Sequence, residues 1–257
     1  MANYYYLASL LPSLDFPSSP DISFASITES LRLNLSETDF KKIEALRLFI
    51  DITNIRPLLL EESIDGRGNL SEKDLDEALL IKDFLPQYVF DFLDKHDTLS
   101  AKLHHFSELV ALFFASELPK QKGFLHKYFT FEREWRLVVL ALRAKSAQRD
   151  VMKELQFEDF SDALVADILA QKDAPAYDPP LEYQDLKEQF LSCGPDPWQQ
   201  HKMLCTYRFG KIAEMVGGGQ FSMDAILAYI TQLIIVEYWN ELDEQRGRVI
   251  LDTFKST

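Results

Sequence analysis

A largely apolar segment near the middle of the chain reads FLHKYFTFEREWRLVVLALRAK and runs from Phe124 to Lys145. It is apolar on nearly every side between Leu137 and Leu142, which predicts a central, well-buried helix. Elsewhere in the chain, apolar and polar side chains do not alternate over more than a few residues, as they would in a half-buried strand. Only 9 of the 257 residues are glycine, which also favours helices. We therefore expect an all-α protein.

Capping patterns and apolar periodicity predict further helices on both sides of this stretch. Ser36 and Ser71 each stand three residues before an aspartate and just ahead of an apolar helical run, as N-cap residues do. The run after Ser36 continues toward Leu60, and Pro57 is expected to bend or end it. The other expected helices cover residues 1–14, 23–35, 84–93, 103–114, 151–170, 181–191, 198–215 and 223–254, with loops at 63–69 and 174–180.

A short phrase of acid and arginine occurs three times, in or beside apolar segments. Its copies contain Asp51, Asn54 and Arg56; Glu134, Arg136 and Arg143; and Asp243, Arg246 and Arg248. An acid and an arginine three to five residues apart lie on neighbouring faces of one helix. Such side chains either clamp that helix to another helix of the same chain or contact a partner protein. Counted from loop to loop, the copies predict three divergent helical repeats at residues 1–66, 67–147 and 148–257.

Charge and composition limit the partners and the compartment. The formal net charge of −14 argues against nucleic acid, because binding phosphates needs a surplus of lysine and arginine. The most apolar run, residues 225–239, is interrupted by Thr231, Gln232 and Glu237, so we expect no direct membrane insertion. The first residues carry no basic segment, so a signal peptide is not expected. Because two cysteines suit a reducing compartment, we expect a cytoplasmic protein.

The third phrase and the residues before it resemble a known family. Leu227-Ala228-Tyr229 leads into a long helical run that ends in the Asp243 phrase. This order resembles the C subunit of V-type and archaeal-type ATP synthases, whose eukaryotic counterpart is the d subunit. The opening from Asn3 to Pro12, taken with the Asp51 phrase, further resembles a bacterial family of unassigned function encoded among V-type ATPase genes.

That resemblance implies a fold and a role. It implies a funnel of three similar helical domains with pseudo-threefold character, without catalytic activity or a cofactor. The C subunit links the rotor shaft to the membrane ring, so the implied partners are the rotor-shaft subunit and the membrane ring subunit of a V-type ATPase. The implied location is cytoplasmic and peripheral to the inner membrane through the complex.

The histidines suggest a different class of protein. His96-Asp97 spells the dipeptide of HD-type phosphohydrolases, which are helical and metal-dependent. Those enzymes need a metal-binding histidine upstream, and no histidine precedes His96. His104 and His105 are adjacent, so on a helix their rings diverge, and we expect surface histidines rather than a metal site.

Further candidate ligands do not form a recognisable site. Cys193, His201 and Cys205 match no common zinc spacing and lack a fourth ligand. We therefore expect no metal, no cofactor and no enzymatic activity. A metal-dependent phosphohydrolase-like enzyme and a helical adaptor unrelated to ATPases remain the alternatives.

Overall fold

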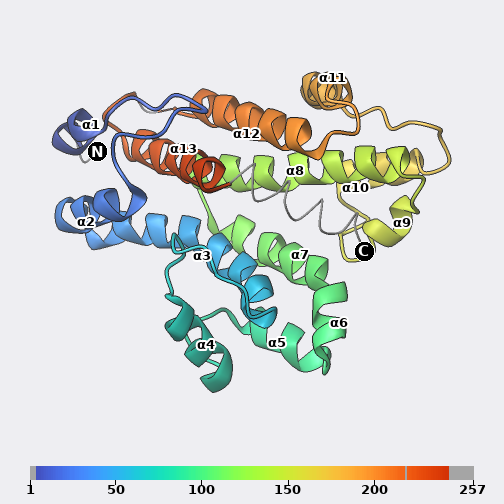
Figure 1. The fold of residues 1–257 in the computed structure, drawn as a ribbon, viewed down its shortest axis with the longest axis horizontal. Coiled ribbons are helices and arrows are strands. Elements are labelled where there is room, and N and C mark those ends of the chain that lie inside the picture. The colour runs from blue at the N-terminus through green and yellow to red at the C-terminus, as the bar shows by residue number, and fades with distance from the viewer. Residues whose placement is uncertain (1–3, 218, 243–257) are drawn as a thin grey trace, which may run out of the picture. The chain divides into compact units, whose positions relative to one another are not determined.

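The computed structural model describes residues 4–217 and 219–242. These residues form thirteen α-helices and two short 3₁₀-helices, and they contain no strand (Figure 1). The expected all-α class is therefore confirmed. None of the helices in the described chain combines the length and the apolar character needed to cross a bilayer.

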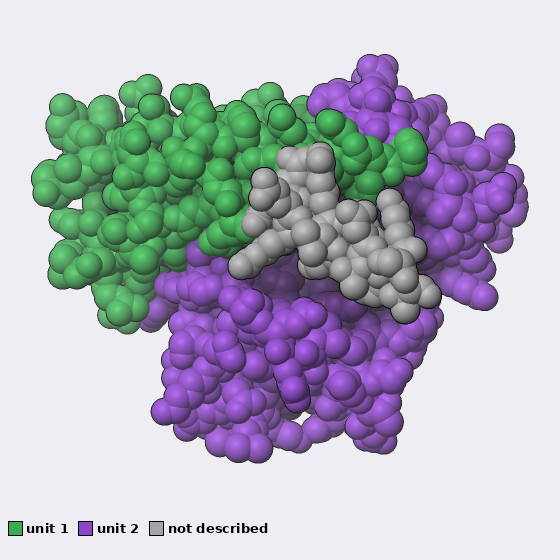
Figure 2. Space-filling model, in the orientation of Figure 1, with its two compact units in different colours: residues 1–40, 195–257 green, residues 41–194 purple. Residues whose placement is uncertain are grey.

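The chain divides into two compact units, which Figure 2 shows in different colours. Unit 1 comprises residues 1–40 and 195–257, and unit 2 comprises residues 41–194. These boundaries differ from the expected ones after residues 66 and 147. The three repeats and their pseudo-threefold character stay a prediction.

Unit 1 combines helices from the early and the late part of the sequence. Its helices are α1 (Tyr5–Leu10), α2 (Phe24–Asn34), α12 (Pro197–Glu214) and α13 (Met223–Glu241), and α3 (Glu37–Leu59) begins in it. Helix α13 packs against both α12 and α2. The carboxylate of Glu237 on α13 accepts a hydrogen bond of 2.6 Å from the backbone N–H of Phe24. This bond satisfies one of the open backbone donors at the start of α2 and joins helices more than 200 residues apart in sequence.

Unit 2 contains the remaining elements. They are α4 (Glu72–Ile81), α5 (Gln87–Lys95), α6 (Leu99–His104), α7 (Phe106–Glu117), η1 (Leu118–Lys120), α8 (Gly123–Ser146), α9 (Val151–Glu154), α10 (Ala163–Ala170), η2 (Leu181–Tyr183) and α11 (Gln184–Ser192). Helix α8 contacts α9, α10 and α11, so the predicted central helix is present. Its Val138 and Ala141 are fully buried.

Phenylalanine rings form the centre of unit 2. Phe49 of α3 lies 4.8 Å from Phe113 of α7, between ring centroids, and Phe113 lies 5.4 Å from Phe129 of α8. Phe113 and Phe129 have no exposed surface. Tilted and edge-on ring pairs at such distances add to the free energy gained by burying the rings. The cluster therefore fixes α3, α7 and α8 to one another.

Side-chain caps explain where several helices begin. The hydroxyls of Ser36 and Ser71 accept hydrogen bonds of 3.2 Å from the backbone N–H of Asp39 and Asp74, as predicted. The helix expected at 151–170 is wrong, because α9 ends at Glu154 and α10 begins only at Ala163. Asp162 starts α10 by accepting bonds from two backbone N–H groups of its first turn.

Other helices also differ from the sequence prediction. The helix expected at 103–114 is interrupted at His105, between α6 and α7. The helix expected at 84–93 begins at Gln87, because Phe84 has a positive φ of 62° and Pro86 is extended. The helix expected at 223–254 is described as far as Glu241. Its continuation from residue 243 lies outside the described residues.

Candidate functional site

The first phrase lies against the loop that follows its own helix. Asp51 of α3 is 1% exposed, and its carboxylate accepts a 2.8 Å bond from the side-chain amide of Asn69. It also accepts a 3.1 Å bond from the backbone N–H of Leu70. Burial raises the pKa of Asp51 to about 6, although these two bonds act in the opposite direction.

Two more side chains of α3 hold the same loop. The side-chain amide of Asn54 donates a hydrogen bond of 2.9 Å to the backbone carbonyl of Asp65 and accepts one of 2.9 Å from the backbone N–H of Asp65. Arg47 donates from Nε to the carbonyl of Arg67 at 2.9 Å and from a terminal nitrogen to the carbonyl of Gly68. Residues 47, 51 and 54 recur at helical spacing and share one face. We call Arg47, Asp51 and Asn54 the α3 clamp.

The loop is shaped to fit the α3 clamp. A Cβ atom on Gly68 would lie 2.4 Å from Oδ1 of Asp51, which is closer than two such atoms can approach. A Cβ atom on Gly66 would meet nothing within 4 Å. Arg67, which is 5% exposed, pairs with the carboxylate of Asp65 at 2.7 Å. Only Gly68 therefore has to be glycine for the backbone to approach Asp51.

Arg56 completes the first phrase and makes its contacts away from Asp51. Its guanidinium donates to the carbonyl of Leu103 at 3.3 Å and lies 5.8 Å from the ring centre of Phe106. The side chain is exposed. Arg56 thus connects α3 to the junction of α6 and α7 within unit 2.

The second phrase also contacts neighbouring elements of unit 2. Glu134 accepts a 2.7 Å bond from the hydroxyl of Tyr183, and burial raises the pKa of Glu134. Arg136 pairs with Glu132 at 3.0 Å, not with Glu134. Its guanidinium also lies 4.7 Å from the ring centre of Phe49, so α8 is attached to α3.

Arg143 of the second phrase makes one ring contact, and the third phrase has no described contacts. Arg143 is exposed, and its guanidinium lies 5.7 Å from the ring centre of Phe190 on α11. Asp243, Arg246 and Arg248 lie outside the described residues. A contact with a partner protein therefore stays a prediction for all three phrases.

Sequence reasoning missed Glu132 and Arg47. Glu132 has no exposed surface, and it accepts a 3.0 Å bond from the indole N–H of Trp135 as well as the bond from Arg136. The signal was present, because Glu132 precedes Arg136 by four residues and Arg47 precedes Asp51 by four. The loop partners gave no such signal, since residues 65–70 reach α3 only through the tertiary fold.

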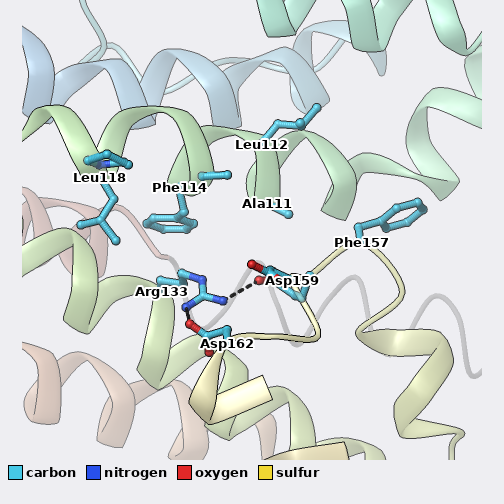
Figure 3. A pocket seen from close by; sticks show the side chains of 11 residues that line it. Ala111, Leu112, Phe114, Leu118, Arg133, Phe157, Asp159 and Asp162 are labelled. Carbon is cyan, nitrogen blue, oxygen red and sulfur yellow. Dashed lines mark hydrogen bonds and ion pairs between the residues drawn. The ribbon is translucent and has the colours of Figure 1, made fainter. Parts of the chain in front are cut away.

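A cavity of about 460 Å³ lies in unit 2, beside another arginine of α8. Figure 3 shows Arg133 reaching Asp162, and Phe114 of α7 and Leu118 of η1 also line the cavity. The guanidinium of Arg133 donates hydrogen bonds of 2.9 Å to the carboxylate of Asp162 and of 3.1 Å to that of Glu158. Burial opposes its charge, yet the two carboxylates hold the pKa of Arg133 above its usual value. Because both carboxylates engage this guanidinium, the cavity does not offer an unpaired cation to an anionic ligand.

The histidines lie closer together than expected. His96 contacts Glu108 at 2.9 Å, and its ring stacks on His105 with centroids 4.7 Å apart. His104 is exposed, as expected of a surface histidine, whereas His96 and His105 are partly buried. Burial, followed by the charges of His96 and His104, lowers the pKa of His105.

No group of three or more histidine, cysteine or acidic side chains in the described residues is arranged to hold a metal ion. The thiol of Cys193 donates to the carbonyl of Gln189 at 3.3 Å. Cys205 lies 3.6 Å from a ring nitrogen of His201, one turn earlier on α12. These contacts are local ones within or next to a helix.

The chain matches a family model along its whole length. That family is described as "Protein of unknown function (DUF2764)", and the match covers residues 1–257. The chain belongs to this family. Uncharacterized proteins of Chlamydia muridarum and Chlamydia trachomatis are each 30% identical to it over 258 residues, covering 98% of this chain and 97% of theirs. No solved structure matches the chain. The names of the family and of these relatives state no activity, so function is argued from the residues.

Proposed function

We propose that the protein is a non-catalytic central-stalk (rotor) subunit of a V-type ATP synthase or ATPase, linking the rotor shaft to the membrane ring. The observation that carries the proposal is the triple acid–arginine phrase with its Leu227-Ala228-Tyr229 lead-in, which resembles the C subunit of those enzymes. On this proposal the chain works in the cytoplasm, at the surface of the inner membrane, through its partner subunits.

The contacts of the first two phrases support a mechanical role. Asp51 and Asn54 hold a loop, Arg56 contacts the α6–α7 junction, and Arg136 attaches α8 to α3. A part that transmits torque has to be stiff, and close-packed helices with cross-connections of this kind are stiff.

The raised pKa values do not require catalysis. Burial raises the pKa of Asp51 and of Glu134, a change that also marks catalytic acids. Asp51, however, is bound by Asn69 and Leu70, and Glu134 is bound by Tyr183. Each carboxylate therefore has a structural partner that accounts for its burial.

Purification of the complex tests the proposal. An affinity-tagged chain is expressed at its native level, membranes are solubilised gently, and co-purifying subunits are quantified by mass spectrometry. We expect the shaft and ring subunits in amounts comparable to the chain itself. Recovery of the folded chain without either subunit would refute the proposal, and recovery with unrelated partners would favour the adaptor. Bound metal in stoichiometric amount near His96 would instead favour the phosphohydrolase-like enzyme.

Two arginine variants then distinguish a role within the chain from a role in contacting a partner protein. Arg56→Ala and Arg143→Ala each remove an exposed guanidinium that contacts a ring or a carbonyl within unit 2. Loss of folding, seen by circular dichroism, would show that the arginine holds helices of this chain together. Intact folding with loss of the shaft or ring subunit would assign it to the interface.

A further inference from the structure

The end of α4 carries apolar side chains that no part of unit 2 covers. Leu80 is 82% exposed, Ile81 is 51% exposed and Phe84 is 71% exposed. The inward face of α4 is already provided by Leu75 and Ala78, which are fully buried. Figure 1 shows α4 at the edge of unit 2. The helix therefore has a second apolar side beyond the one its own core uses.

The backbone after α4 holds this apolar side outward. Lys82 ends the helix with a φ of 57°, and Phe84 follows with a φ of 62°. A bulky residue rarely adopts this left-handed conformation, which favours glycine. Lys82 is held by an ion pair of 2.7 Å to Asp94 on α5. A strained backbone that presents a phenylalanine to solvent is a feature more typical of a binding surface than of a plain loop.

Of these residues, Leu80, Lys82 and Asp94 line a groove of about 370 Å³ whose walls come from α3, α4, α5 and α6. Six apolar side chains line it: Leu58, Leu59, Leu79, Leu80, Phe90 and Leu93. A second hollow continues from it, and the two share Leu58 and Asp76. A floor of this composition takes up apolar side chains from one face of a helix.

The charges around the groove are predominantly acidic. The acids that line the two hollows are Glu61, Glu62, Glu72, Asp76 and Asp94. The bases are Lys73, Lys82 and Lys102. Because Lys82 and Asp94 neutralise each other, four acids face two lysines. The rim therefore complements a positively charged partner, in line with the chain's net charge of −14.

We propose that this surface, the α4 groove, binds an amphipathic helix of a partner protein, with the apolar face of that helix in the groove and lysines or arginines along its flank. Leu80 contacts the apolar face inside the groove, and Phe84, which is exposed two residues after the groove-lining Lys82, extends this contact. Glu62 and Asp76 attract the basic flank. This binding role does not depend on the V-type ATPase assignment, because it is inferred from the apolar and acidic residues of the groove alone.

A designed peptide pair probes the groove directly. One labelled peptide of about 18 residues, long enough to form a helix, carries leucines at positions i, i+3, i+4 and i+7, with lysines elsewhere. The matched peptide has glutamate in place of every lysine. Binding to the full chain is followed by fluorescence anisotropy. We expect saturable binding of the lysine peptide and none of the glutamate peptide.

Variants of the chain show where the peptide binds. Leu80→Gln combined with Phe84→Gln removes two exposed apolar contacts and is expected to weaken binding at least about tenfold. Glu62→Gln combined with Asp76→Asn is expected to weaken it and to reduce its salt dependence. Leu181→Gln alters a leucine that is 90% exposed but does not line the groove, and Glu77→Gln alters a charge of α4 that does not line it. Both controls should bind as the unaltered chain does.

Three results would overturn the proposal. The lysine peptide could fail to bind, or it could bind the Leu80/Phe84 double variant as tightly as the unaltered chain, which would mark general attraction to an acidic protein. Sedimentation could also show that the unaltered chain self-associates and that the double variant is monomeric. In that case a second copy of the chain would occupy the groove.

Discussion

Two glycines of one loop offer a matched test of the α3 clamp. In Gly68→Ala, the new methyl group would lie 2.4 Å from Oδ1 of Asp51 and 3.2 Å from Nδ2 of Asn54. The loop or the carboxylate then has to move by roughly 1 Å to restore normal contact. Gly66→Ala adds the same methyl group two residues earlier, where nothing lies within 4 Å.

The expected size of the effect follows from the bonds that depend on this close approach. Asp51 accepts bonds of 2.8 Å from Asn69 and 3.1 Å from the N–H of Leu70. A hydrogen bond to a charged group contributes about 1.5–3 kcal/mol, so losing one of them and weakening the other lowers the free energy of unfolding by about 2–4 kcal/mol. Gly66→Ala should instead be neutral or raise it by about 0.4–1 kcal/mol, through the unfolded chain.

Thermal unfolding and hydrogen exchange measure this difference. In a domain of this size, we expect the melting temperature of unit 2 to fall by roughly 5–10 °C in Gly68→Ala and not to fall in Gly66→Ala. Exchange of the amides in residues 65–70 should accelerate in Gly68→Ala alone. Equal stability of the two variants would show that Asp51 and the loop do not hold each other in the way described.

Three further changes test the buried charges. The pKa of Asp51 is raised to about 6, so between about pH 4 and pH 6 the folded state keeps a proton that the unfolded chain releases. The free energy of unfolding should therefore fall by about 3 kcal/mol as the pH rises through this range, and urea unfolding at a series of pH values should find a smaller fall in Asp51→Asn. Glu132→Ala leaves the guanidinium of Arg136 and the indole N–H of Trp135 without the carboxylate that binds them, and should lower the free energy of unfolding by about 1–3 kcal/mol. Glu132→Gln should lower it by less, and identical urea midpoints for the two variants would contradict this explanation. The pKa of His105 is lowered, so the stability that its neutral ring contributes should be lost as the pH falls below the ordinary pKa of histidine. His105→Phe should therefore unfold at a lower pH than the unaltered chain, and an NMR titration that finds an ordinary or raised pKa for His105 would exclude this explanation.

Local signals in the sequence predicted the helices well where one residue decides the boundary. Ser36 and Ser71 were predicted as N-caps, and each accepts the expected backbone bond. The helix at 151–170 was predicted wrongly, because its apolar spacing is continuous while Asp162 starts a new helix within it. Apolar periodicity alone does not report such a break, since an aspartate can lie on the polar face of a helix or cap its start.

The candidate site could be predicted only in part. Asp51, Asn54 and Arg136 were found by their spacing, but their partners were not. Asn69 and Leu70 reach Asp51 because the loop folds back along α3, and no pattern within one helix encodes that return. The acid that binds Arg136 is Glu132 and not the Glu134 of the phrase, so two acids two residues apart were not distinguished.

The stoichiometry of the assembled enzyme tests the proposed function most directly. Native mass spectrometry of the V-type ATPase from the organism that encodes this chain would measure which subunits accompany one rotor shaft. The proposal predicts one copy of this chain per shaft, and predicts that its removal separates the shaft from the membrane ring. An intact complex that contains shaft and ring, couples ATP hydrolysis to ion transport and lacks this chain would contradict it.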